Sequence, residues 1–282
     1  MRSEFNLNFE NPVKVAQDDS VALTKACEQA IKKYQKLKNL DPKTLEADCE
    51  SLSEKLRGNS APDYGSPKTA AAYLQKYQLS HSYMTYQIFS TVLKRVHIEG
   101  HQNIYICDVG SGINAGLVGL LLSLKYLDIQ NKIYFDMVEP SKEMIRAGKY
   151  FYECLPDKLK LLSKQLHLKR HLGPSFDPPH DTMRIVTAFH LYAPYYSPAP
   201  KKCHPRKNSS IDDLNHAIRE IAPHLILLTC HEGKKEIFND VIKQDTVSND
   251  YSFGQCSVPQ PADRSGSHLG TPTKACFLWR AK

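Results

Sequence analysis

The sequence predicts an α/β fold, in which helices cover both faces of a mostly parallel β-sheet. Three observations support this class. Apolar runs at 104–108 and 133–138 flank a Gly-rich turn and an apolar helical segment, which is the pattern of a βαβ unit. Strand-like and helix-like segments then continue to alternate. Two strand-like runs, 251–258 and 274–282, close the chain and favour a hairpin at one edge of the sheet.

The chain before the βαβ unit is expected to be helical. Segment 21–37 places small and apolar residues near one stripe, and segment 41–56 begins with an Asp-Pro pair suited to a helix cap and first turn. Segment 68–96 fits two helices with a break near Ser80. These segments predict a helical layer beside the sheet.

A loop rich in Gly, Pro, Ser and Asn, at 58–67, separates the first helical segments from the rest. We therefore divide the chain into an N-terminal helical region, residues 1–66, and a main domain, residues 67–282. The boundary is placed on composition alone.

After the βαβ unit the pattern continues to alternate, with one gap. Residues 156–166 fit either a helix or the third strand, and the Pro-rich stretch after them reads as a loop. The expected elements are a helix at 141–155, a strand at 183–192, a helix at 209–224, a strand at 225–233 and a helix at 234–244.

Composition limits the class of protein. The N-terminus lacks the basic-then-apolar order of a secretory signal, and the longest apolar run, 117–124, is too short for a membrane span. The eight cysteines lie at irregular intervals without a C-x-x-C pair, which favours reduced thiols over disulfides or zinc. We expect a soluble cytoplasmic protein with no membrane partner and no metal. The residues to check for a metal would be Cys203, His204, Cys230 and His231.

The positive charge is concentrated in one segment. Residues 155–207 contain ten Lys and Arg against three Asp, a surplus of +7 that equals the net charge of the whole chain. Such a patch suits a phosphate-bearing partner such as RNA, and it also fits a solvated basic surface. Both interpretations stay open.

Acidic and glycine residues mark the carboxyl ends of the first two expected strands. Asp108 is followed by Gly110 and Gly112, and Glu139 ends the second strand. Ligands of open parallel sheets bind at these ends, where an acid can accept hydrogen bonds from a ribose diol. The spacing also fits a dinucleotide site, but a carboxylate two residues before the first glycine suits a ligand with an ammonium group. Asp108 therefore favours S-adenosylmethionine.

Residues 104–116 and 133–141 resemble motif I and the following acidic motif of class I S-adenosylmethionine-dependent methyltransferases, whose fold is a Rossmann-like, seven-stranded sheet with a closing antiparallel hairpin. The resemblance covers about residues 70–282. It implies that the methionyl part is held by Asp108, Gly110, Ser111 and Gly112, the ribose by Glu139, and the adenine by Pro140 and Ser141. For the adenine contact after the third strand, Asp177 and Asp181 are the options.

The methyl acceptor is expected among two groups of residues. Four tyrosines that precede the first strand could wall a substrate pocket or belong to the core: Tyr73, Tyr77, Tyr83 and Tyr86. The second group follows the 183–188 run, where His190 or Tyr192 could serve as a base, with Phe189, Tyr195 and Tyr196 beside them. The acceptor would be an oxygen or nitrogen of a small molecule or protein side chain.

Two alternatives to that acceptor are kept. One is an RNA or ribosome-associated substrate bound through residues 155–207, and the other is a non-catalytic scaffold with a degenerate cofactor site. Residues 71–93 are also similar in layout to methyltransferase-like proteins of the mitochondrial small ribosomal subunit, although their cysteine-rich iron–sulfur signature is absent. The string at 193–196 is faintly similar to the Asn/Asp-Pro-Pro-Tyr motif of amino-group methylases, but it lacks the leading Asn/Asp and the second proline.

Overall fold

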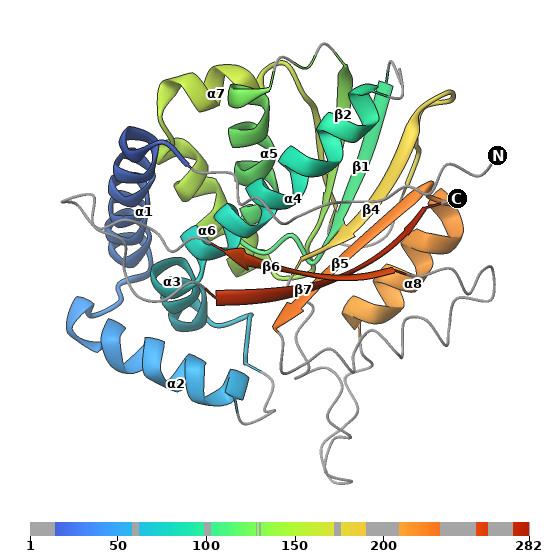
Figure 1. Ribbon diagram of the computed structural model, residues 1–282. Coiled ribbons are helices and arrows are strands. Elements are labelled where there is room, and N and C mark those ends of the chain that lie inside the picture. The colour runs from blue at the N-terminus through green and yellow to red at the C-terminus, as the bar shows by residue number, and fades with distance from the viewer. Residues whose placement is uncertain are drawn as a thin grey trace, which may run out of the picture.

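The computed structural model describes residues 15–57, 62–98, 103–127, 129, 131–171, 176–189, 209–231, 252–258 and 273–281. Their elements form one twisted sheet with helices on both faces (Figure 1). The helices before the sheet are α1 (Gln17–Lys38), the short 3-10 helix η1 (Pro42–Thr44), α2 (Leu45–Arg57), α3 (Pro67–Lys76) and α4 (Gln78–Ile98).

The sheet has the strand order β3-β2-β1-β4-β5-β7-β6. Its strands are β1 (Asn103–Val109), β2 (Lys132–Val138), β3 (His167–His171), β4 (Met183–Ala188), β5 (Leu225–His231), β6 (Ser252–Val258) and β7 (Thr273–Ala281). The pairs among β1 to β5 are parallel, and β7 pairs antiparallel with both β5 and β6. The predicted α/β class, with a parallel sheet of five strands and flanking helices, is confirmed.

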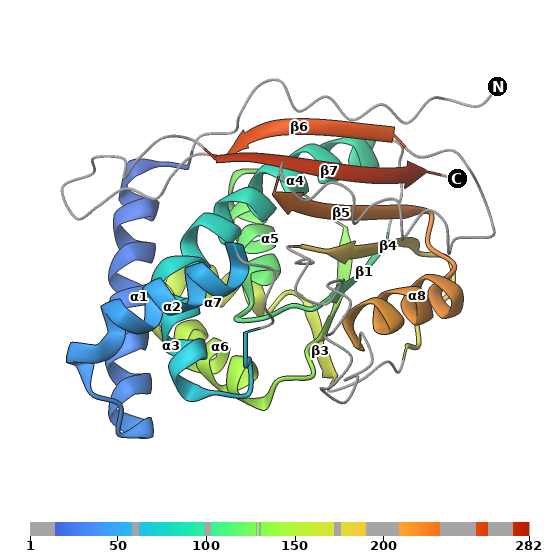
Figure 2. The ribbon, with the colours of Figure 1, turned by 90° about the horizontal axis from the view of Figure 1, so that it is seen from below.

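Two hydrophobic layers sandwich the sheet. One layer joins the helices α1 to α4 with α5 (Ala115–Tyr126), α6 (Lys142–Cys154) and α7 (Asp157–Ser163), and it includes Ile106 of β1 and Phe135 of β2. The other layer packs α8 (Ser209–Ile221) against alternate residues of the same strands, such as Cys107 and Val186. The two layers follow from strands that are buried on both faces, as parallel strands usually are. Figure 2 shows α8 on the opposite side of the sheet from α4 and α5.

Helix α4 lies against α5 and leads into β1. The hydroxyl of Thr85 donates to the carbonyl of Ala115 at 2.8 Å, and one turn later Ser90 Oγ lies 3.1 Å from Ser123 Oγ. The two helices therefore run in the same direction, from the carboxyl ends of the strands towards their amino ends. Close contact depends on Gly119, whose missing side chain leaves room for the backbone of α4.

The N-terminal helices share the core of the sheet rather than forming a separate one. Leu23 of α1 and Leu52 of α2 belong to the same hydrophobic layer as the strands. Tyr34 of α1 also donates to Glu143 of α6 at 2.7 Å. The division of the chain at residue 66 remains a prediction. Within the described part of the chain, no helix combines the length and the apolar character that crossing a membrane requires.

The boundaries differ from expectation in three places. The break between the first two helices of the main domain falls at Tyr77, because α4 begins at Gln78 rather than after Ser80. Residues 156–166 hold α7, and the third strand follows at 167–171. That strand is polar and largely exposed because it is an edge strand, so it lacks the apolar signature used to find strands. The strand expected at 183–192 ends at Ala188. The helix expected at 234–244 lies outside the described residues.

Candidate functional site

A glycine loop connects β1 to α5 at the carboxyl edge of the sheet. Gly110 and Gly112 have φ of 71° and 55°, in the left-handed region that favours glycine. The amides of Gly110 and Ser111 donate to the carbonyl of Val138, at 2.8 and 3.1 Å, which ties the loop to the end of β2. A Cβ on Gly110 would meet no atom of the described residues within 4 Å. The loop therefore presents open backbone to the space above β1.

Glu139 holds this loop to the next helix. One oxygen of its carboxylate accepts from the amide of Gly112 at 2.8 Å, and the other accepts from the amide of Ser141 at 2.8 Å. Ser141 also caps α6, since its hydroxyl accepts from the amide of Met144 at 3.1 Å. Each carboxylate oxygen has two lone pairs, so an oxygen that accepts one hydrogen bond can also accept a second.

Asp108 is a buried acid beneath the glycine loop. Its Oδ1 accepts from the hydroxyl of Thr187, at the end of β4, at 2.9 Å. Its Oδ2 is buried and finds no hydrogen-bond donor among the described residues. A Cβ on Gly116, in the first turn of α5, would overlap this oxygen. An unpartnered carboxylate oxygen at a ligand-binding edge is a place for a ligand donor.

Burial raises the pKa of Asp108 to about 7; the hydrogen bond from Thr187 opposes this shift, and the charge of Glu139 adds to it. The folded protein therefore binds this proton more tightly than the unfolded chain, whose carboxyl has a pKa near 3.8. The stability contributed by Asp108 must fall as pH rises between these two values and stay low above pH 7.

The asparagine side chain of the variant Asp108→Asn does not titrate, so we expect this variant not to lose stability as pH rises. Relative to the wild type, its free energy of unfolding should rise by about 4 kcal/mol between pH 4 and pH 8, since one unit of pKa is about 1.4 kcal/mol. Urea denaturation at a series of pH values measures the difference. Parallel stability curves for the two proteins would contradict the buried, proton-binding state of Asp108.

Asn114 and Arg170 are site residues that the sequence did not reveal. Asn114 has φ of 66° before the first residue of α5 and donates to the carbonyl of Gly148 in α6 at 3.0 Å. The guanidinium of Arg170, on β3, donates to Asn114 Oδ1 at 3.3 Å. Arg170 comes from the basic segment 155–207, so one of its charges is directed to the loop. The available signal was the residue type, because asparagine tolerates the left-handed conformation better than most residues.

Three of the four predicted substrate tyrosines belong to the hydrophobic core: Tyr73, Tyr83 and Tyr86. Tyr83 is 1% exposed, and its hydroxyl donates to Ser20 of α1 at 2.9 Å. Tyr86 is also 1% exposed, and its ring packs against Tyr126 of α5. Burial raises the pKa of both hydroxyls to about 12, although their side-chain hydrogen bonds oppose the shift. Both rings fill the interface between helices, and their role as substrate contacts stays a prediction.

Tyr73 and Tyr77 lie in an aromatic cluster near the site. The hydroxyl of Tyr73 is 2.6 Å from Nδ1 of His81, and Tyr77 packs against both rings. Tyr64 packs edge-on against Tyr73, and its carbonyl accepts from the hydroxyl of Ser141 at 2.6 Å. The cluster is thereby joined to the residue that follows Glu139 and Pro140. His81 was not recognised in the sequence, since a single histidine in an apolar helix is ordinarily structural.

The structure describes only some of the remaining predicted residues. Phe189 follows β4 and packs against Phe89 of α4, with ring centroids 5.4 Å apart. Asp181 lies two residues before β4 and therefore at the amino edge of the sheet, the edge opposite to the glycine loop. Asp177 is exposed. The residues His190, Tyr192, Tyr195, Tyr196, Cys203 and His204 lie outside the described part of the chain.

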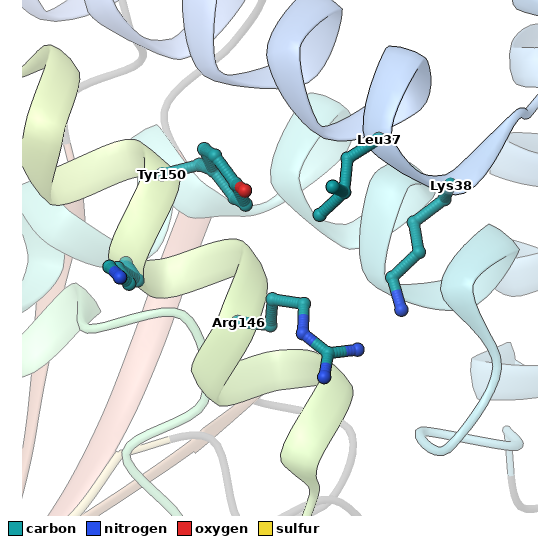
Figure 3. Close-up of a pocket in the computed structure, with 5 residues that line it drawn as sticks. Leu37, Lys38, Arg146 and Tyr150 are labelled. Atoms are coloured by element: carbon teal, nitrogen blue, oxygen red, sulfur yellow. The ribbon is translucent and has the colours of Figure 1, made fainter.

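A cavity of about 430 Å³ lies elsewhere, between the end of α1 and α6 (Figure 3). Lys38 and Arg146 line it, and both contact Glu143. Although burial opposes the shift, hydrogen bonds from Lys38 and Tyr34 and the charge of Arg146 lower the pKa of Glu143. Lys38 thus forms an ion pair between α1 and α6, and Arg146 forms one within α6.

No family model matches the sequence, and no curated protein matches it. Among solved structures, the chain is similar to a Listeria monocytogenes protein described as a class I S-adenosylmethionine-dependent methyltransferase. Their TM-score is 0.49 and their identity 13%, over 95% of this chain and 89% of that chain.

Human METTL16 is another structural neighbour. Its N-terminal domain in complex with SAH has a TM-score of 0.40 at 10% identity, over 85% of this chain and 83% of that chain. Its catalytic domain in complex with the MAT2A 3′UTR hairpin 1 has a TM-score of 0.41 at 11% identity, over 83% of this chain and 91% of that chain. At these values, the similarities assign no activity to the chain.

Proposed function

We propose that the chain is an S-adenosylmethionine-dependent methyltransferase, with its catalytic domain in residues 67–282. One arrangement carries the proposal. A buried acid with an unpartnered oxygen, Asp108, lies beneath a glycine loop with open space over Gly110, and a second acid, Glu139, ends the neighbouring strand. A ligand with an ammonium group and a ribose would satisfy both acids.

The residues present fit this cofactor. Asp108 and the loop from Gly110 to Gly112 would hold the methionyl part, and Glu139 the ribose diol. Pro140 is exposed and Ser141 is half-buried beside it, as contacts to an adenine require. The bound cofactor supplies an electrophilic methyl group, and the protein's task is mainly to position an acceptor in line with it.

The acceptor proposed is an oxygen or nitrogen nucleophile of a small molecule or a protein side chain. The aromatic cluster of Tyr64, Tyr73, Tyr77 and His81 supports this assignment, because it joins the end of β2 through Ser141. Tyr73 and Tyr77 belong to this cluster, and the roles of Tyr83 and Tyr86 as substrate contacts stay predictions. The roles of His190 and Tyr192 as bases, and of Tyr195 and Tyr196 as contacts, stay predictions.

Calorimetry with S-adenosylmethionine tests the proposal. We expect the wild type to bind, and Gly110→Ala to lose at least tenfold in affinity, because the methyl group would occupy the open space over the loop. The added Cβ also strains a left-handed residue, which costs about 1–2 kcal/mol. Asn39→Ala is the matched control, since Asn39 has φ of 50° at the end of α1, away from the site. Absence of binding to the wild type, or equal binding by Gly110→Ala, would contradict the proposal.

RNA is the second candidate for the acceptor. Lys158 in α7, Lys164 directly after it and Lys169 on the edge strand β3 are exposed. Exposed cations suit the phosphates of RNA. An assay at low salt that detects no RNA binding removes this candidate.

A further inference from the structure

Helix α8 covers one face of the sheet unevenly. Its main strand contacts are with β1 and β4. β2 and β3 lie beyond them, and β3 ends the sheet on the side opposite to β6 (Figure 2). Side chains alternate between the two faces along a strand, and Tyr134, which is paired in register with His167, packs against the hydrophobic layer of α8. The same face therefore carries Lys132, Tyr134, His167 and Lys169, which we call the β2–β3 face.

Two stacked rings lie at the centre of the β2–β3 face. The ring centroids of Tyr134 and His167 are 4.6 Å apart, and the ring planes meet at 22°. Tyr134 is half-buried, whereas His167 is exposed on the edge strand. One face of the imidazole ring therefore rests on Tyr134, and the other is directed away from the sheet. A flat ring with one free face is a place where a nucleobase can extend the stack.

The exposed charges of this face are positive. Lys132 Nζ lies 5.2 Å from the centroid of the Tyr134 ring, and Lys169 follows His167 by two residues on the same side of β3. Both lysines are exposed, and neither forms an ion pair with a described residue. Two such cations beside stacked rings match the two parts of a nucleotide, its phosphate and its base.

The acid on the same face is withdrawn from solvent. Asp136, paired in register with Lys169, is 2% exposed. Its Oδ2 accepts from the hydroxyl of Tyr105 at 2.9 Å and lies 3.1 Å from Nε2 of His171. These contacts hold the carboxylate inside the sheet layer. Asp177 is an exposed acid, and it adjoins the half-buried Phe176 at the border of the face. The exposed part of the face therefore consists of rings and cations.

The β2–β3 face extends from the edge strand to α8 and to the candidate site. The ring of His171 packs against Phe176, and Phe176 packs against His216 of α8, with centroids 6.4 and 6.0 Å apart. The backbone carbonyl of His171 accepts from the amide of Glu139 at 3.0 Å. A strand bound along β3 would thus end beside Glu139, at the carboxyl edge of the sheet.

We propose that the β2–β3 face binds single-stranded nucleic acid, with a base stacked on His167 and neighbouring phosphates on Lys132 and Lys169. Bases of a duplex stack on each other, so this ring selects unpaired strands. Lysines on an edge strand also prevent pairing with another sheet, but that role does not account for the stacked rings, which add apolar surface to the edge. The proposal goes beyond methyl transfer, because a strand can bind here whether or not it is the acceptor.

Fluorescence anisotropy of the full chain with a labelled single-stranded RNA of about ten nucleotides tests the stacking contact. We expect His167→Ala to weaken binding at least fivefold, because a base loses the ring on which it stacks. The matched variant His167→Phe keeps a flat ring and should bind at least as tightly as the wild type. A duplex of the same sequence should change by less than about twofold in His167→Ala, since its bases are not free to stack.

Lys132→Ala and Lys169→Ala test the phosphate contacts. Each should weaken binding of the single strand and lower the slope of log affinity against log salt by about 0.7, the contribution of one phosphate contact. Lys33→Ala is the matched control, because Lys33 is exposed on α1, which belongs to the layer on the opposite face of the sheet. It should leave the affinity and the slope unchanged.

Absence of single-strand binding by the wild type at low salt overturns the proposal. An equal loss for strand and duplex in His167→Ala, or an equal loss in His167→Phe and His167→Ala, overturns it as well, since neither fits stacking. A dimer that His167→Ala dissociates in sedimentation, without binding of RNA, would instead assign the face to a second copy of the chain. Binding of S-adenosylmethionine is measured separately, so its absence would contradict the proposed function and leave this proposal standing.

Discussion

Glu139→Ala is expected to lose all measurable binding of S-adenosylmethionine and about 2–5 kcal/mol of the free energy of unfolding. The carboxylate accepts from the amides of Gly112 and Ser141, and its removal leaves both amides without this partner. Each buried amide that loses its partner costs about 1–3 kcal/mol. The glycine loop and the start of α6 would then no longer be joined. Urea denaturation and calorimetry measure the two effects.

Two further variants, Glu139→Gln and Glu143→Gln, test whether the loss of binding depends on the carboxylate of Glu139. Glu139→Gln keeps the side-chain volume but replaces one carboxylate oxygen, which accepts hydrogen bonds, by an NH2 group, which donates them. We therefore expect its affinity for S-adenosylmethionine to fall at least a hundredfold. Glu143 lies four residues later and bonds to Lys38 and Arg146, away from the loop. Glu143→Gln should lower stability and leave the affinity unchanged. Wild-type affinity in Glu139→Gln would remove Glu139 from the cofactor site.

Gly119→Ala is expected to lower the free energy of unfolding by about 2–3 kcal/mol. A Cβ at this position would lie 2.5 Å from the backbone nitrogen of Tyr86 and 2.7 Å from the carbonyl carbon of Thr85. Helix α4 would have to move away from α5, and overpacking of a tight interface typically costs this much. For a chain of this size, the thermal midpoint should fall by about 5–10 °C.

Two further variants distinguish a steric clash at residue 119 from a general loss of packing between α4 and α5. The Cβ would overlap the hydroxyl of Thr85 as well as these two backbone atoms. Because the backbone atoms remain in Thr85→Ala, adding this substitution to Gly119→Ala should not restore stability. Ser123→Ala, one turn later on the same face, removes only hydrogen bonds, with Ser90 and with two backbone carbonyls, and should cost about 0.5–1.5 kcal/mol. Recovery of stability in the double variant would show that the side chain of Thr85, rather than the close approach of α4, is the obstacle.

Local patterns located the centre of the fold and the acids of the site. The apolar runs around the Gly-rich turn predicted β1, α5 and β2, because strands buried on both faces must be apolar throughout. The same runs placed Asp108 and Glu139 at strand ends, where parallel strands bring them to one edge. The sequence did not locate the polar strand β3. This strand is largely exposed and pairs with β2 alone, so it lacks an apolar run.

The sequence by itself determined the α/β class, the βαβ unit and the position of its two acids, since these follow from hydrophobic pattern and glycine spacing along the chain. Only the tertiary structure decided which polar groups find partners. The hydroxyl of Tyr83 donates a hydrogen bond to Ser20, sixty-three positions away in the chain, so Tyr83 can be buried in the core. Gln78 Oε1 and Asp108 Oδ2 are left without described partners. Hydrogen-bond satisfaction depends on distances between residues remote in sequence, which local pattern does not encode.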